Sequence, residues 1–238
     1  MNSQKDKNKI IGELKRLIGI IFLPKTTLRN IISKPTWFMP LLIIIIVQIA
    51  FYILTIDIQK KDEIEKMRIW GMSEERIERV QSQINSPNKY YTIPTIPINL
   101  IINLSISVFI YLFLFKLLLK KELKFNSVFS TVVWCSIVGL SSKSIIYLVI
   151  ILLKNTAYSI NISLALFLPK PTINEKLPIL YQILSKFDFF TIWQYVLLIM
   201  AFNILCEIPR KQYIILIFIV FLPMILIIFL NLFFHLIY

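Results

Sequence analysis

Long apolar stretches separated by short charged ones dominate the pattern along this chain. The five longest are residues 38–56, 98–119, 128–153, 189–206 and 213–236. Each is roughly 18 to 26 residues long, enough at ~1.5 Å per residue to cross a hydrocarbon core of ~30 Å. Helices that are apolar on every side belong in lipid or in a very large core. The pattern therefore predicts an all-α, polytopic integral membrane protein with a bundle of five transmembrane helices.

The N-terminal segment, residues 1–36, has a different pattern. Residues 1–9 are polar and are expected to lack fixed structure, whereas a helical period starts at Ile10. One side of this helix carries the apolar residues Ile10, Leu14, Leu17, Ile18 and Ile21, while Lys9, Lys15 and Arg16 lie away from it and Glu13 lies at its edge. Two interpretations stay open: the helix lies flat on an anionic leaflet, or it packs against the protein's own bundle.

Prolines and threonines divide the approach to the first apolar stretch. Pro24 ends the amphipathic helix, and Thr26 or Thr27 is placed to cap a short helix over residues 28–33. Pro35 disfavours the helical region for the residue before it, which predicts a turn.

The predicted transmembrane domain, residues 37–238, begins at this turn. Trp37 stands where an indole ring favours the membrane interface. Pro40 fits the first turn of the first span, where a missing N–H costs little.

A polar insert, residues 57–93, interrupts the transmembrane domain. Glu75 and Arg79 form an acid–base pair at helical spacing, Gly71 divides the insert, and Ser73 is placed to cap its second helix. We interpret the insert as a solvated helical hairpin or, alternatively, as a lid that binds a partner. The apolar segment 159–168 is too short to span a bilayer and is expected to be interfacial or re-entrant.

Composition and charge agree with the membrane assignment. The chain is 57% hydrophobic and 16% charged, and its net charge is +13. Lysines beside the spans account for this positive charge, because they contact anionic lipid headgroups. No nucleic-acid partner is therefore expected. Their distribution favours a multi-pass protein of the cell membrane with a cytoplasmic N-terminus and the C-terminus on the opposite face. Cys135 and Cys206 lie in apolar stretches and are expected to be free thiols.

A stripe of polar residues marks the second span. Asn99, Asn103 and Ser107 recur every four residues, so they share one side of a helix. In lipid such a stripe must face protein or water. Hydrogen bonding between helices and the lining of a polar pathway are the two interpretations.

The third span carries a ridge of small residues and a charge. The ridge consists of Ser127, Thr131, Cys135 and Gly139, at a spacing that lets another backbone approach closely. Lys143 continues it, within a Ser-Ser-Lys-Ser sequence over residues 141–144 that is expected to break the helix. We expect Lys143 to meet Asp188, which starts the fourth span, although an N-cap is the simpler role for that carboxylate.

Catalytic motifs are missing from the sequence. It has no HExxH or GxSxG motif, no phosphate-binding glycine loop, and one histidine. We therefore expect neither an enzyme nor a cofactor. The first hypothesis is a membrane scaffold or adaptor whose partners are lipid, an unidentified membrane or cytoplasmic protein, or a second copy. The alternative is a transporter or channel component that uses Lys143 and the polar stripe.

The order of several motifs resembles the Yip domain family, five-span membrane proteins named for their interaction with Ypt/Rab GTPases. The similar positions are Pro24, Thr27, Pro35, Trp37 and Pro40 before the first span, and the Asp188-x-Phe-x-x-Trp193 sequence at the fourth. The resemblance covers residues 10–212 and fits a prokaryotic-type member. It implies a bundle of five membrane helices.

Overall fold

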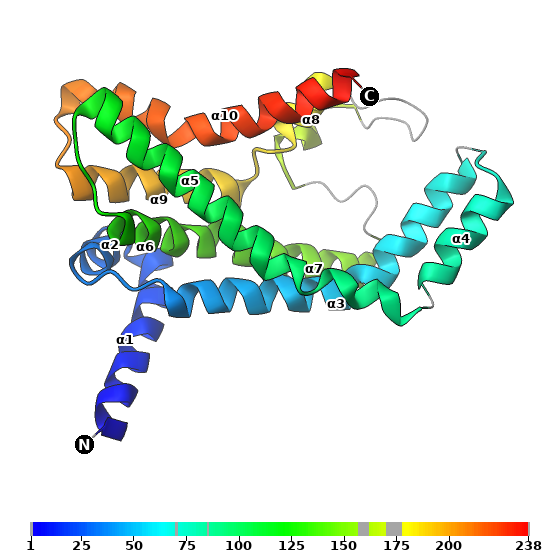
Figure 1. Ribbon diagram of the computed structural model, residues 1–238, viewed down its shortest axis with the longest axis horizontal. Coiled ribbons are helices and arrows are strands. Elements are labelled where there is room, and N and C mark those ends of the chain that lie inside the picture. The colour runs from blue at the N-terminus through cyan, green and yellow to red at the C-terminus, as the bar shows by residue number, and fades with distance from the viewer. Residues whose placement is uncertain (1, 70, 85, 157–161, 170–177, 238) are drawn as a thin grey trace. The chain divides into compact units, whose positions relative to one another are not determined.

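The computed structural model describes residues 2–69, 71–84, 86–156, 162–169 and 178–237. Within these ranges the regular elements are helices, and the only β-type pairing is an isolated bridge between Ser163 and Asp188. In Figure 1 the regular elements of the described residues are drawn as coiled ribbons. The predicted all-α class is therefore confirmed for the described residues.

Four helical stretches of the described chain are long and apolar enough to cross a membrane. They are Phe38–Glu65, Tyr90–Leu119, Phe125–Lys154 and Phe189–Cys206. These four correspond to the first four predicted spans. The fifth, 213–236, coincides with helix α10 (Tyr213–Ile237), but several of its side chains lie outside the described set, so its crossing stays a prediction.

The chain divides into two compact units. Unit 1 comprises Met1–Ile44, Ile101–Gly139 and Ile192–Tyr238, and unit 2 comprises Ile45–Leu100 and Leu140–Thr191. Unit 1 contains α1 (Asn2–Phe22), α2 (Pro24–Ser33), α6 (Phe125–Ser136), η4 (Arg210–Gln212) and α10, with most of α5 (Thr95–Leu119) and α9 (Phe189–Cys206). Its core includes the fully buried Phe115, Trp134 and Phe202. The rings of Phe115 and Phe202 lie 4.9 Å apart.

The N-terminal helices start earlier than the sequence predicted. Helix α1 begins at Asn2 and ends at Phe22, so the first residues are helical. Helix α2 begins at Pro24, because proline at the first helical position needs no N–H partner. Neither threonine caps it: the Thr26 hydroxyl donates to the Leu23 carbonyl at 3.0 Å, and Thr27 is buried.

Unit 2 contains the polar insert and helix α3 (Phe38–Ile69) from Ile45 onward. The first helix of the predicted hairpin is the continuation of α3, which ends before Gly71 turns the backbone with φ of 65°. Helix α4 (Glu74–Ile84) then begins directly after Ser73. The remaining elements are η1 (Pro87–Thr92), α7 (Lys143–Lys154), η3 (Leu164–Phe167) and α8 (Ile179–Leu184). Of the short apolar segment, residues 159–161 lie outside the described residues.

The third predicted span is continuous, although the sequence predicted a break in it. Helix α6 passes into a π-helical segment, η2 (Ile137–Ser142), and then into α7. The segment that ends at the serines 141 and 142 therefore has the wider π-helical geometry, and it does not interrupt the helix. π-Helical turns of this kind occur frequently at functional sites.

The contact between α1 and α2 depends on a glycine. A Cβ atom on Gly19 would overlap the Thr27 hydroxyl, whereas a Cβ on Gly12 would meet nothing within 4 Å. We expect Gly19→Ala to destabilise the protein by about 1–3 kcal/mol through overpacking. The matched change Gly12→Ala should leave stability unchanged or raise it slightly.

Thermal unfolding of the detergent-solubilised variants checks this prediction. Adding Thr27→Ala to Gly19→Ala removes the overlapping hydroxyl and should restore part of the lost stability. Equal melting temperatures for the two glycine variants would contradict the packing described here.

Candidate functional site

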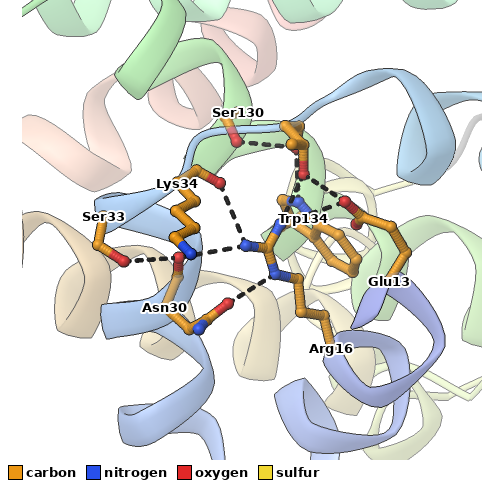
Figure 2. A network of polar contacts seen from close by, with 8 residues as sticks. Glu13, Arg16, Asn30, Ser33, Lys34, Ser130 and Trp134 are labelled. Atoms are coloured by element: carbon orange, nitrogen blue, oxygen red, sulfur yellow. Dashed lines mark hydrogen bonds and ion pairs between the residues drawn. The ribbon is translucent and has the colours of Figure 1, made fainter. Parts of the chain in front are cut away.

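A buried arginine on α1 is the centre of a polar network in unit 1 (Figure 2). Arg16 is 9% exposed, and Glu13 beside it is 5% exposed. The guanidinium Nε donates to Asn30 Oδ1 at 2.8 Å, and Nη1 donates to Thr36 Oγ1 at 2.6 Å and to Glu13 Oε1 at 3.3 Å. The Thr36 hydroxyl also donates to the same Glu13 oxygen, at 2.9 Å. The network thus joins α1, α2 and the linker after α2.

The end of α2 explains why an arginine is needed there. The Lys34 carbonyl lies beyond the end of α2, just before the turn at Pro35, while the Asn30 carbonyl already accepts from the Lys34 backbone N–H and the Ser33 hydroxyl. Arg16 Nη2 donates to the carbonyls of Asn30 at 3.4 Å and Lys34 at 3.2 Å. Only the planar guanidinium, with five donors, serves two carbonyls, a hydroxyl, an amide and a carboxylate at once.

The linker carries the network on to α6. The Thr36 carbonyl accepts from Trp134 Nε1 at 2.7 Å and from the Ser130 hydroxyl at 2.9 Å. Trp134 and Ser130 are both fully buried. The next residue, Trp37, packs edge-on against Phe129 with ring centroids 5.5 Å apart. Helix α1 is therefore fixed, through the linker, to the helix that forms the third predicted span.

The apolar side of α1 points away from these contacts. Ile11, Leu14, Ile18 and Ile21 are 49%, 52%, 64% and 44% exposed, while Ile20 on the other side is fully buried. The side that packs on the rest of unit 1 is the one that carries Arg16, predicted to lie away from the apolar side, and Glu13, predicted to lie at its edge. Contact of the apolar side with a leaflet stays a prediction.

The predicted meeting of Lys143 and Asp188 is confirmed in unit 2. Lys143 Nζ lies 2.6 Å from Asp188 Oδ2, and the carboxylate is completely buried. Asp188 also acts as an N-cap: Oδ1 accepts from the Thr191 backbone N–H at 2.9 Å. The Thr191 hydroxyl donates to Oδ2 at 2.8 Å. The two expected roles of Asp188 are therefore filled together, by different oxygens.

Hydrogen bonding decides the protonation of Asp188, which precedes the fourth span. Burial by itself raises the pKa of the carboxyl, but hydrogen bonds from Lys143 and Thr191 outweigh burial and hold the pKa below its ordinary value of 3.8. A carboxyl whose pKa is lower in the folded state stabilises the fold above its unfolded pKa. That stabilisation is complete at neutral pH and is lost as the pH falls through the folded-state pKa.

Two glutamines that the sequence analysis did not single out hold the middle of the third predicted span. In unit 2, Gln48 Nε2 donates to the Leu140 carbonyl at 3.4 Å and to the Ser144 hydroxyl at 2.9 Å. In unit 1, Gln194 Nε2 donates to the Ser136 hydroxyl at 3.1 Å, and its side chain lies against Gly139. The small-residue ridge thus admits an amide side chain beside the π-helical segment.

The other residues from the sequence analysis are not gathered into one site. Asn99 and Asn103 are exposed on α5, and the Ser107 hydroxyl donates to the Asn103 carbonyl of its own helix at 2.9 Å. Pro40 is buried in the first turn of α3, and Trp193 is half-buried on α9. Hydrogen bonding of the stripe to another helix stays a prediction.

The fold defines a class: an all-helical protein with several apolar helices that suit a membrane and a folded N-terminal segment attached to them. The Yip1 domain model matches residues 18–232, nearly the whole chain, so this protein belongs to the Yip1 domain family. The family resemblance seen in the sequence is confirmed. No curated protein and no solved structure matches the chain.

Arg16 should contribute far more to stability than its exposed neighbour. Removing one partner of a buried ionic network leaves unpaired polar groups and typically costs about 3–5 kcal/mol. We expect Arg16→Met to lower the melting temperature in detergent strongly, while Lys15→Met changes it little. Arg16→Lys should recover only part of the loss, because an ammonium group lacks the planar fork. A lysine that restored full stability would contradict the geometry of Figure 2.

Exchanging the charges of Lys143 and Asp188 tests their pairing. Lys143→Asp or Asp188→Lys alone places like charges together and should cost about 2 kcal/mol or more, a figure discounted because Lys143 is a third exposed. The double exchange should restore the ion pair but not the N-cap, leaving a deficit of about 1 kcal/mol. Unfolding by heat, with the exposed pair Glu75 and Arg79 exchanged as the control, measures these differences.

Proposed function

We propose that this protein is a non-enzymatic membrane scaffold or adaptor that binds a partner protein or shapes the bilayer, with α1 as its lipid-contacting element. One observation carries the proposal. The polar side of α1 is fixed to the protein by Arg16, while its apolar side is left exposed. A helix held in this way presents its apolar surface in a fixed orientation, which suits an element that binds a lipid surface.

The energetics favour insertion of this surface among lipid headgroups. Burial of a large aliphatic side chain contributes about 1.5–3 kcal/mol, so side chains that are half exposed gain roughly half of that each. A basic residue close to an anionic leaflet adds about 1 kcal/mol. Lys15 and Lys25 are exposed and available for this role. Burial of the apolar side chains contributes the larger part of the binding free energy, and attraction of the basic residues to anionic lipid adds to it.

The orientation and partner follow from the same reasoning. We place the N-terminus on the cytoplasmic side of the cell membrane, where anionic lipid and basic flanking residues meet. The C-terminus then lies on the opposite face if α10 crosses. The polar insert that includes α4 is the surface we assign to a protein partner, because it extends the apolar α3 into a charged helix.

A transporter or channel component is the alternative function. It would need mobile charges or a polar pathway along the spans. The ammonium of Lys143 is held by Asp188, and the Ser107 hydroxyl is bonded to its own helix. These contacts support the scaffold over the alternative.

Environment-sensitive fluorescence tests the role assigned to α1. In a background with Cys135 and Cys206 replaced by alanine, a nitrobenzoxadiazole dye is attached through Ile18→Cys on the apolar side or through Gly12→Cys. Gly12 is exposed, has free space around it and lies roughly a third of a turn away from Ile18. After reconstitution, the emission from position 18 should shift to the blue in phosphatidylglycerol vesicles, whereas that from position 12 should shift less.

Equal emission from the two positions would contradict the lipid contact. A flux assay on the same vesicles addresses the alternative function. Solute movement that stops on replacement of Asn103 or Lys143 would overturn the scaffold proposal.

A further inference from the structure

Helix α5 has a second surface that the proposed function does not use. Its inner side is buried in unit 1, where Val108, Tyr111 and Phe115 are at most 3% exposed. The opposite side is open: Ile106 is 52% exposed and Phe113 is 66% exposed. This outer side is apolar, as lipid contact requires, except for the exposed amides of Asn99 and Asn103.

Asn103 lies at the depth of the lipid tails. Helix α5 has 25 residues and is therefore about 37 Å long, somewhat longer than a hydrocarbon core of ~30 Å. Asn103 is eight residues from its start, about 12 Å along the axis. An amide at that depth has no water to bind, and its unsatisfied donors and acceptor are costly there.

Within the described part of the chain, this amide has no partner. Ser107, one turn further on, donates to the Asn103 backbone carbonyl, and no described residue forms a hydrogen bond with the Asn103 side chain. Asn99, one turn earlier on the same helix, is exposed as well. The amide is thus available to a group from outside the chain.

We propose that this side of α5, centred on Asn103, binds a second copy of the same chain. Two copies that share an orientation in the membrane are related by an axis along the membrane normal, which brings identical residues together at equal depth. The asparagine amide carries both donors and an acceptor, so two facing copies form reciprocal hydrogen bonds. Asn99 repeats the same complementarity one helical turn away.

The amide also distinguishes a second copy from other occupants. Lipid tails can bind neither the NH2 donors nor the carbonyl acceptor of the amide. A helix of another protein would need its own polar group at the same depth, whereas a second copy supplies one by symmetry. Polar residues hold membrane helices together in this way, each contact adding a modest increment to packing.

Disulfide trapping in native membranes tests the inference. The background again replaces Cys135 and Cys206 by alanine but keeps Asn103, and single cysteines are placed at position 106 or at position 101. Ile106 is 52% exposed and lies one turn from Asn103 on the same side of α5, whereas Ile101 is 42% exposed and lies on the far side of the helix. Mild oxidation should join chains of the Ile106→Cys variant into a dimer of twice 28.1 kDa and leave Ile101→Cys monomeric.

A second measurement isolates the hydrogen bond. Single-molecule photobleaching of the dye-labelled protein in liposomes gives the fraction of dimers against protein density. Asn103→Leu should weaken association about 3- to 20-fold, while Asn103→Gln, which keeps an amide, should retain most of it. The substituted residue is on the outer surface, so the fold should survive and its melting temperature provides the check.

Three results would overturn the proposal. Equal crosslinking at positions 101 and 106 would mean random collision. A monomer at every density would mean that the surface faces lipid alone. A crosslinked product of any other mass would mean that a different protein occupies it.

Discussion

Polar groups at hydrocarbon depth have no water to bind, and this constraint governs how the described parts of the chain are held together. Lys143 finds Asp188 at 2.6 Å, and Gln48 donates to a carbonyl of the π-helical segment. In unit 1, Arg16 serves the carbonyls at the end of α2, where the chain turns. These three contacts join segments that are 14 to 92 residues apart in sequence, so a few hydrophilic side chains tie separate elements together while the apolar majority supplies packing.

Much of the fold could be predicted because lipid imposes a simple length rule. The fourth predicted span, 189–206, has the same bounds as α9, since Asp188 caps one end and polar residues follow the other. The first span was harder, because α3 continues past the lipid-length stretch into charged residues that also favour helix. Sequence patterns indicate where apolarity ends, but a helix ends only where its backbone turns, here at Gly71.

The candidate sites were predictable only where charge made them stand out. Lys143 and Asp188 are charges beside apolar stretches, so each needed a partner. Helical periodicity places Arg16 away from the apolar side of α1 and Glu13 at its edge, because it ranks residues by polarity alone. Two signals point to Arg16: it is an arginine among many lysines, and the Pro35 turn follows a carbonyl, that of Lys34, beyond the end of α2. The roles of Gln48 and Gln194 depend on tertiary contacts that no local pattern encodes.

The attachment of α1 has a consequence for the order of assembly during synthesis. The Thr36 carbonyl accepts a hydrogen bond from Trp134, which lies 98 residues further along the chain. Translation delivers the N-terminal part first, so the guanidinium can reach Thr36, 20 residues away, long before Trp134 exists. Helix α1 thus gains its attachment to α6 only after another 98 residues have been added beyond Thr36. Until the third hydrophobic stretch has been made, only the bilayer surface and nearby residues are present to hold it.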